Sequence, residues 1–318
     1  MQYVAIYCIV KISCFVGVIC VILCSHSAPM KKALTIDQQI ARLKDHGMKF
    51  DNIDKAKEIL LDVGYYRFGF YTFPFEITFP QIHRRNHQLR PGTTFKSVYD
   101  LYEFDTRLRR VLLNALDRIE VNVRTHITYT VSTAYVDYPV WYIDSRFVKQ
   151  DFIDQFDEKV YKTLLENPII KRHHQHYPND RHAPVWKAME FMTFGNITSL
   201  YRAIKDESLK RKIAARYGCS IGVFVNYLET IRVIRNKCAH GGCLFNIELP
   251  IGIKGRPANI SPDSRHNISG AISVIKYILG KISVARKTDL EEDIKRLLSA
   301  IKTPETQRVV FDCSKISL

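Results

Sequence analysis

The longest regular pattern of apolar residues lies near the middle of the chain, from Thr94 to about Tyr129. This stretch contains no glycine and no proline, and an apolar residue recurs every three or four positions. Since an α-helix turns once in about 3.6 residues, this spacing places the apolar side chains on one face. The pattern therefore predicts one long amphipathic helix. Its apolar positions are Leu101, Leu108, Leu112, Ala115 and Ile119.

Shorter helical patterns precede and follow this segment. Thr35 and Gln38 form a capping-box pattern, and the apolar stripe that they begin ends at Gly47. Ser220 is a suitable N-cap for a helix over residues 221–239. No alternating strand pattern of convincing length is present, so the sequence predicts an all-α fold. The other predicted helices cover residues 54–63, 151–165, 205–217, 267–284 and 288–301 (the last with a capping box from Thr288 to Glu291), and one more begins at Pro184 and carries Trp186 and Glu190.

The segment from Gly64 to Phe75, GYYRFGFYTFPF, is rich in aromatic residues and is interrupted by glycine and proline. Its rings, with Arg67 among them, have the chemistry that stacks on nucleic-acid bases. Packing in the hydrophobic core at a tight corner is the commoner role of such a cluster. We therefore expect core packing here, and keep Arg67 as a candidate RNA contact.

The end of the predicted helix over residues 221–239 carries an unusual group of polar residues, in the stretch ETIRVIRNKCAHGG. At about 100° per residue, Arg232, Asn236 and His240 form one stripe, and Arg235 lies beside it. Arg235 and His240 are about 140° apart on a straight helix. They converge on one substrate only if the helix ends near Cys238 or if a second copy of the chain supplies the opposite wall. The alternative is that these side chains cap the exposed carbonyls of the helix end.

The later part of the long central helix, DRIEVNVRTHI, is also unusually polar. Glu120 and Arg124 are four residues apart, and Arg118 and His126 lie nearby. One interpretation is a salt-bridged helix face. The other is a second polar patch that lines the same cavity as the polar helix end described above.

The composition adds an excess of positive charge. The chain has 47 Lys and Arg against 32 Asp and Glu, which gives a formal net charge of +15 at pH 7. Such an excess attracts polyanions, so nucleic acid or an anionic membrane surface is the first class of partner to consider. A generally basic protein without such a partner is the alternative.

The cysteines and histidines do not form a metal-binding pattern. Four of the eight cysteines lie within the first 24 residues, and the others show no CxxC spacing, so neither a zinc site nor a disulfide framework is expected. The run KRHHQHYPNDRH, from Lys171 to His182, has four histidines without a fixed ligand spacing. We expect this run to be a solvated basic loop, and we expect no metal and no cofactor.

The N-terminal residues from Val4 to Cys24 are almost continuously apolar, and only Lys11 interrupts them. The segment is long enough to span a bilayer, which makes a single-span membrane anchor one interpretation. No Lys or Arg precedes the run, so the pattern is poor for a signal peptide. The interpretation that we prefer is a cytoplasmic protein translated from Met30, with residues 1–29 a mistaken upstream extension.

The hexapeptide RNKCAH, from Arg235 to His240, resembles the R-x(4–6)-H signature of HEPN domains. It is most similar to the RNxxAH form of the Abi-like (abortive infection, AbiD/AbiF type) family. Other segments resemble this family in the same order, and the resemblance covers about Met30 to Asn246. Members commonly begin shortly before a TIDQQI-like segment, which favours Met30 as the start. The other segments are KKALTIDQQIARLKDHG, GYYRFGFYTFPF, TFKSVYDLYEFDTRLRRVLLNALDRIEVNVRTHI and APVWKAMEFMTFGNITSLY.

The resemblance implies a HEPN-like helical bundle and, as in the catalytic members of that superfamily, a metal-independent endoribonuclease that acts as a dimer with two signatures facing each other. His240 would be the general acid or base at the ribose 2′-hydroxyl or the leaving 5′-oxygen. Arg235 would bind the charge that develops on the phosphate, and Asn236 would orient the phosphate or the imidazole. The products would carry 2′,3′-cyclic phosphates. The residues expected to contact RNA are Arg232, Arg118, Glu120, Arg124, His126 and Arg67.

The expected organisation has three parts: a hydrophobic leader over residues 1–29, an Abi-like domain over 30–246, and a linker with a C-terminal helical pair over 247–318. The expected function is phage defence by RNA cleavage, with RNA and a second copy of the chain as partners and a regulatory RNA or an antitoxin as a further candidate. Two alternatives stay open. One is a non-catalytic HEPN module that binds RNA or protein, although the intact arginine and histidine favour the enzyme. The other is a membrane-anchored defence or signalling protein, if the leader is genuine.

Overall fold

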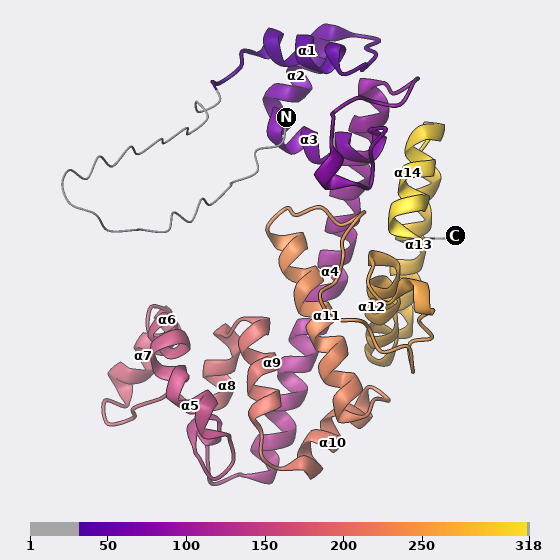
Figure 1. Cartoon of the computed structure of the whole chain (residues 1–318). Helices are drawn as coiled ribbons and strands as arrows, with labels where there is room; N and C mark the ends of the chain where they lie inside the picture. Colours follow the sequence, from indigo (N-terminus) through magenta and orange to yellow (C-terminus); the bar gives the residue numbers. More distant parts are fainter. Residues whose placement is uncertain (1–31, 317–318) are drawn as a thin grey trace, which may run out of the picture. The chain divides into compact units, whose positions relative to one another are not determined.

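The structure is a computed structural model, and it describes residues 32–316. Helices and short helical turns form its regular structure, and no β-strand occurs within that range (Figure 1). The predicted all-α fold is therefore confirmed. The apolar segment over residues 4–24 lies outside the described residues. Among the helices that are described, none has both the length and the hydrophobicity that crossing a bilayer requires.

The chain divides into two compact units, and the first extends to Val98. The predicted capping box is present at its first helix, where the Gln38 N–H donates to Thr35 Oγ1 at 3.3 Å and the Thr35 N–H donates to Gln38 Oε1 at 2.9 Å. The elements of this unit are α1 (Ile36–Asp45), α2 (Ile53–Val63), α3 (Tyr65–Thr72) and the 3-10 turns η1 (Phe73–Phe75) and η2 (Ile82–Arg84).

The aromatic segment of the first unit forms part of its core. Phe68, Tyr71 and Phe75 are almost completely buried. The ring of Phe68 stacks on that of Phe95, with 4.6 Å between the centroids. Stacked rings remove a large apolar area from water, and this stabilises the corner between the helices. Core packing is therefore confirmed for these three residues.

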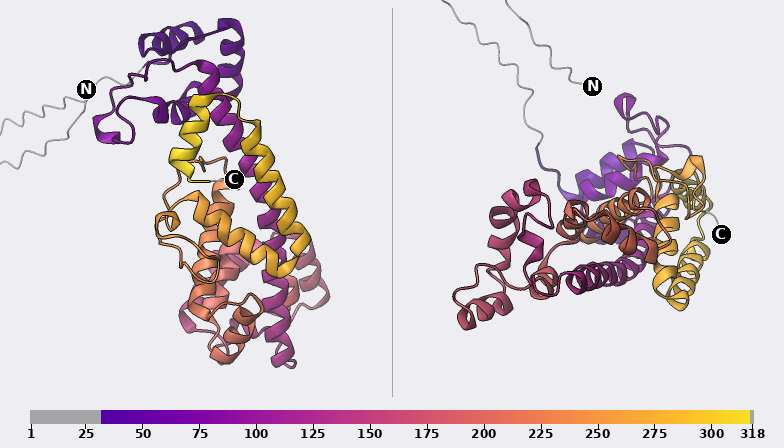
Figure 2. Two further views of the ribbon diagram at one scale, coloured as in Figure 1. Left: turned by 90° about the vertical axis from the view of Figure 1, so that its right-hand side faces the viewer. Right: turned by 90° about the horizontal axis from the view of Figure 1, so that it is seen from below.

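The second unit begins at Tyr99 and contains most of α4 (Phe95–Ala134), with α11 (Ile221–Ala239) alongside it (Figures 1 and 2). The predicted long helix is confirmed, and every position of its predicted apolar stripe is buried. Ser220 caps α11 as predicted. The other elements are η3 (Trp141–Ile143), α5 (Gln150–Phe156), the π-helical turn η4 (Asp157–Tyr161), α6 (Lys162–Leu164), α7 (Pro168–His176), α8 (Val185–Ala188), η5 (Met189–Phe191), α9 (Phe194–Ala203), α10 (Glu207–Arg216), η6 (Pro262–Ser264), α12 (Ile268–Ile282), α13 (Val284–Ala300) and α14 (Pro304–Ser314).

The histidine-rich run is not the solvated loop that was predicted. Asn167 and Pro168 start α7, which contains three of the four histidines, because an N-cap residue followed by proline is a strong helix start. His173 and His182 are buried, and His182 Nε2 lies 2.6 Å from Asp157 Oδ1. A polar partner of this kind offsets the loss of hydration of a buried imidazole. Within residues 32–316, no group of three or more His, Cys, Asp or Glu side chains is arranged to hold a metal ion.

The C-terminal helices differ from the prediction at one boundary and by one helix. α12 and α13 correspond to the predicted pair, but α13 begins at Val284 with Ser283 as its N-cap. The capping box predicted at Thr288 is therefore wrong, and the Thr288 hydroxyl donates to the Val284 carbonyl inside the helix at 3.2 Å. α14 follows the pair and was not predicted.

The irregular residues between α11 and α12 bind to α11. The Asn226 side chain donates to the carbonyl of Gly252 at 3.1 Å and accepts the N–H of Lys254 at 2.8 Å. The Tyr227 hydroxyl donates to the Lys254 carbonyl at 3.0 Å. These residues form a cover that holds the first half of α11 in place.

A buried ion pair on α4 holds the chain where it leaves α11. Asp105 is completely buried, and its Oδ1 accepts the N–H groups of Leu244 at 2.9 Å and Phe245 at 2.8 Å. Its Oδ2 is bonded to Arg109, which also donates to the Gly242 carbonyl at 3.3 Å. A buried carboxylate needs such partners to offset its lost hydration. The contacts therefore fix the turn after α11 against α4.

We expect Asp105→Ala to lower the free energy of unfolding by about 3–5 kcal/mol, because it leaves a buried guanidinium without its carboxylate. Asp117 is an exposed acid on the same helix, so Asp117→Ala is the matched control and should change that free energy by less than about 0.5 kcal/mol. Urea unfolding of both variants measures the difference. Equal effects of the two substitutions would contradict the proposed role of the Asp105 ion pair.

Candidate functional site

The polar end of α11 is a regular helix that stops at a glycine turn. The helix continues to Ala239, and the N–H groups of Gly241 and Gly242 donate to the carbonyls of Cys238 at 3.3 Å and Lys237 at 2.8 Å. Gly241 has a φ of 65°, which glycine adopts without strain. This is a Schellman end, in which backbone donors satisfy the last carbonyls of the helix.

The side chains that were considered as helix caps have other environments. Arg235 Nε donates to Glu120 Oε2 of α4 at 3.2 Å. The His240 side chain makes no hydrogen bond or ion pair within the described part of the chain, and the residue is exposed. The capping interpretation is therefore wrong for Arg235 and His240.

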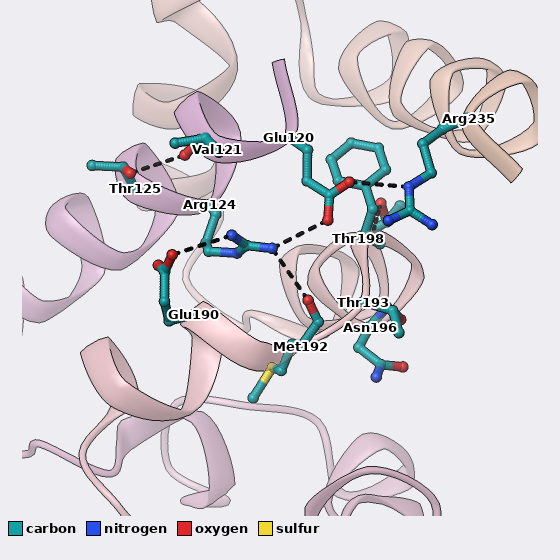
Figure 3. A network of polar contacts seen from close by, with 11 residues as sticks. Glu120, Val121, Arg124, Thr125, Glu190, Met192, Thr193, Asn196, Thr198 and Arg235 are labelled. Atoms are coloured by element: carbon teal, nitrogen blue, oxygen red, sulfur yellow. Dashed lines mark hydrogen bonds and ion pairs between the residues drawn. The ribbon is translucent and has the colours of Figure 1, made fainter. Parts of the chain in front are cut away.

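Glu120 joins two arginines that come from different helices (Figure 3). Its Oε1 accepts from Arg124 Nη2 at 3.1 Å, and its Oε2 accepts from Arg235 Nε at 3.2 Å. Glu120 and Arg124 are buried, whereas the Arg235 side chain is 34% exposed. The predicted salt bridge between Glu120 and Arg124 is therefore confirmed, and both residues are buried. They form a polar patch in direct contact with the polar end of α11.

Arg124 extends these contacts to the segment before α9 (Figure 3). Its Nη2 also donates to the Met192 carbonyl at 3.3 Å, and its Nη1 lies 3.6 Å from Glu190 Oε1. Arg124 and Glu190 also form part of the wall of a cavity of about 330 Å³, together with Tyr129 and Trp186. The ion pairs around Glu120 therefore reach the edge of an open cavity.

Asn236 and His240 occupy the end of α11. They are four residues apart and therefore share one side of the helix, as predicted, with Asn236 partly buried and His240 exposed. No hydrogen bond joins Arg235 to His240 within residues 32–316. A single chain thus holds Arg235 against α4 and presents His240 to solvent.

Arg232 belongs to a separate ionic cluster between α9 and α11. Its Nε lies 3.1 Å from both carboxylate oxygens of Glu229, and Arg202 Nη2 lies 3.3 Å from Glu229 Oε2. The hydrogen bonds from Arg232 lower the pKa of Glu229, against the opposite effect of burial. All three residues line a cavity of about 270 Å³. The structure therefore assigns Arg232 to a different group of contacts from Glu120.

Two further predicted RNA contacts are Arg118 and Arg67. Arg118 is exposed on α4 and lines a small cavity with residues of α12 and α13. Arg67 belongs to α3 of the first unit and is partly buried.

His126, another predicted contact, faces α10. Its ring lies edge-on to that of Tyr217, with 6.0 Å between the centroids. Burial, with smaller contributions from the positive charges of Arg216 and Lys212, lowers the pKa of His126 to about 4. The imidazole is therefore neutral at pH 7.

Several partners of the site have no distinctive signal in the sequence. Glu190 was noted only as part of a helix, and Met192 contributes a backbone carbonyl, for which no side-chain pattern exists. Asp105 and Arg109 are four residues apart, which is a visible signal, but the same spacing is common in solvent-exposed ion pairs. Their burial and the hydrogen bond from the distant Leu244 N–H to Asp105 distinguish this pair from a solvent-exposed one.

The shifted pKa of His126 predicts a pH-dependent contribution to stability. Between pH 6.5 and pH 4 the unfolded chain binds a proton at this position that the folded chain does not, so folding becomes less favourable as the pH falls through this window. We expect His126→Gln to show a smaller decrease in melting temperature than the wild type between pH 7 and pH 5. Thermal unfolding at both pH values measures this, and equal decreases in the two proteins would contradict it.

Comparison with known proteins covers three of the four longer segments singled out above and the RNKCAH segment, and it does not reach KKALTIDQQIARLKDHG. The family model described as Abi-like protein matches residues 58–246, which is more than half of the chain and includes both Glu120 and the RNKCAH segment. No curated protein and no solved structure shows significant similarity to the chain. The chain therefore belongs to the Abi-like protein family.

Proposed function

We propose that this protein acts in phage defence as a metal-independent endoribonuclease of the HEPN type, with Arg235, Asn236 and His240 at its active site. The proposal includes a cytoplasmic location, where RNA substrates are present. Membership of the Abi-like family supports the role in abortive infection. The RNKCAH segment at the end of α11 supports the chemistry.

The observation that carries the proposal is the contact between Glu120 and Arg235. Glu120 accepts from Nε of Arg235, and the two terminal nitrogens of that guanidinium make no hydrogen bond within the described part of the chain. An arginine that is held through Nε keeps these terminal donors available for the paired oxygens of a phosphate. A guanidinium fixed before substrate binds stabilises developing phosphoryl charge without reorganisation.

His240 supplies the proton transfer in this mechanism. Its neutral imidazole removes the proton of the ribose 2′-hydroxyl, and the 2′-oxygen attacks the adjacent phosphorus. The bond from phosphorus to the 5′-oxygen breaks, and the leaving oxygen takes up the proton that His240 removed from the 2′-hydroxyl. The products are a 2′,3′-cyclic phosphate and a 5′-hydroxyl. Asn236, one helical turn before His240, orients the imidazole or the phosphate.

A homodimer completes the proposed site. Within the described part of one chain, Arg235 is held on α4 and His240 lies at the exposed end of the helix, with no hydrogen bond between them. Two copies that place their RNKCAH segments face to face would bring the imidazole of one copy to the guanidinium of the other. The net charge of +15 favours binding of the RNA backbone without selection of sequence.

We expect His240→Ala and Arg235→Ala each to lower the rate of RNA cleavage by about 10²-fold to 10⁴-fold, because each removes a group that acts in the transition state. His176→Ala is the matched control, since His176 is also exposed on a helix, and it should cleave RNA at the wild-type rate. Cleavage of a single-stranded RNA and growth arrest on expression are measured for all four proteins.

Equal cleavage and growth arrest by wild type and His240→Ala would remove the proposed mechanism. Binding of RNA by the wild type without cleavage would identify the protein as a non-catalytic RNA-binding module. Measuring binding and cleavage on the same RNA separates these two outcomes.

A further inference from the structure

We propose that the cavity beside Arg124 is a subsite for an unpaired base of the RNA strand, guanine in particular; this inference rests on the proposed function. The cavity has a volume of about 330 Å³, which is within the range of about 300–1,000 Å³ of small-molecule sites. Two large aromatic side chains line it, Trp186 and Tyr129, and they are 54% and 67% exposed. Aromatic rings with open faces are the usual platforms for unpaired bases.

Both aromatic residues stand on elements that are fixed by packing. Trp186 belongs to α8, where Val185 and Ala188 are completely buried and the Val185 N–H donates to the Pro139 carbonyl at 2.8 Å. Tyr129 stands on the long helix α4. Side chains held by rigid elements lose less freedom when a ligand binds, so a base that enters the cavity meets a preformed surface.

Arg124 and Glu190 supply hydrogen-bonding groups in the same wall of the cavity. Arg124 is only 9% exposed, and its Nε–H is buried without a hydrogen-bond partner within residues 32–316. The carboxylate of Glu190 is 60% exposed. A guanidinium donates to the O6 of guanine, and a carboxylate accepts from its N1–H and N2–H groups. Adenine, cytosine and uracil do not present one acceptor beside two donors, so guanine makes the most hydrogen bonds here.

Hydrogen bonds through Glu120 connect the wall of the cavity to the proposed reaction site. Arg124 Nη2 and Arg235 Nε bind the two oxygens of the same Glu120 carboxylate (Figure 3). A base held at Arg124 and a phosphate held at Arg235 would therefore be positioned through one shared acid. Base binding in the cavity would select the linkage that reaches Arg235 and His240.

The test uses the fluorescence of Trp186 in the full chain. The chain has two tryptophans, and Trp141 is completely buried, so the difference between wild type and Trp186→Phe isolates the signal of Trp186. The probes are single-stranded 2′-O-methyl RNA oligomers, which the proposed mechanism cannot cleave, with one guanine, adenine, cytosine or uracil. An abasic oligomer of the same length is the control for phosphate binding.

We expect the guanine oligomer to quench Trp186 most strongly and the abasic oligomer to leave it unchanged. Trp186→Ala should weaken binding of the guanine oligomer about tenfold or more. Phe311→Ala, which removes an exposed aromatic residue of α14, should leave the affinity unchanged. Equal affinity of Trp186→Ala and wild type, with no quenching by any oligomer, would overturn the subsite.

The experiments distinguish a failure of the subsite from a failure of the nuclease. Quenching by the guanine oligomer, with no cleavage of ordinary RNA, would support the base subsite and contradict the proposed enzyme. Cleavage of ordinary RNA that depends on His240, without quenching, would support the enzyme and contradict the subsite.

Discussion

The carboxylate of Glu120 is the contact on which the candidate site depends. It is buried, and it accepts hydrogen bonds from arginines of two separate helices. A buried carboxylate needs its partners in position to offset its lost hydration, and the buried Arg124 in turn needs the acid. The position of Arg235 is therefore a consequence of how α11 packs on α4. The proposed chemistry uses the two terminal nitrogens of the Arg235 guanidinium, which this packing leaves available.

α4 supplies a second buried acid for the same purpose. Asp105 and Glu120 are 15 residues apart, which is about 22 Å along a helix. Glu120 binds the helix α11 itself, and Asp105 binds the backbone at Leu244 and Phe245 just after it. The two acids thus fix both sides of the turn at Gly241 and Gly242. His240 lies between these two anchors, so its backbone is held although its side chain is exposed.

Local patterns predicted much of the fold. The 3.6-residue period predicted α4, and N-cap residues predicted the starts of α1 and α11, because these signals lie within a few residues of the element that they define. The prediction was wrong at α7, because it relied on the polar composition of the histidine run and did not use the helix start at Asn167. It was also wrong at the start of α13, where Ser283 competes with Thr288 as the cap. In both places two local signals disagreed, and packing selected one of them.

The candidate site was harder to predict than the fold, because its contacts join residues far apart in the chain. Glu120 and Arg235 are separated by 115 residues, and only the packed structure brings them together. The same packing turns His126 toward α10, although it is only two residues from Arg124. Resemblance to the Abi-like family identified the RNKCAH segment, but it gave no information about the acid that holds its arginine.

Attack by the ribose 2′-hydroxyl is tested most directly by measuring cleavage at one modified linkage of an RNA that the protein cleaves. A single 2′-deoxy nucleotide placed on the 5′ side of the cleaved bond removes the attacking hydroxyl and leaves the phosphate unchanged. Cleavage at this bond should be lost, and the unmodified RNA should yield 2′,3′-cyclic phosphate and 5′-hydroxyl ends. Cleavage that persists at the deoxy linkage would contradict attack by the 2′-hydroxyl.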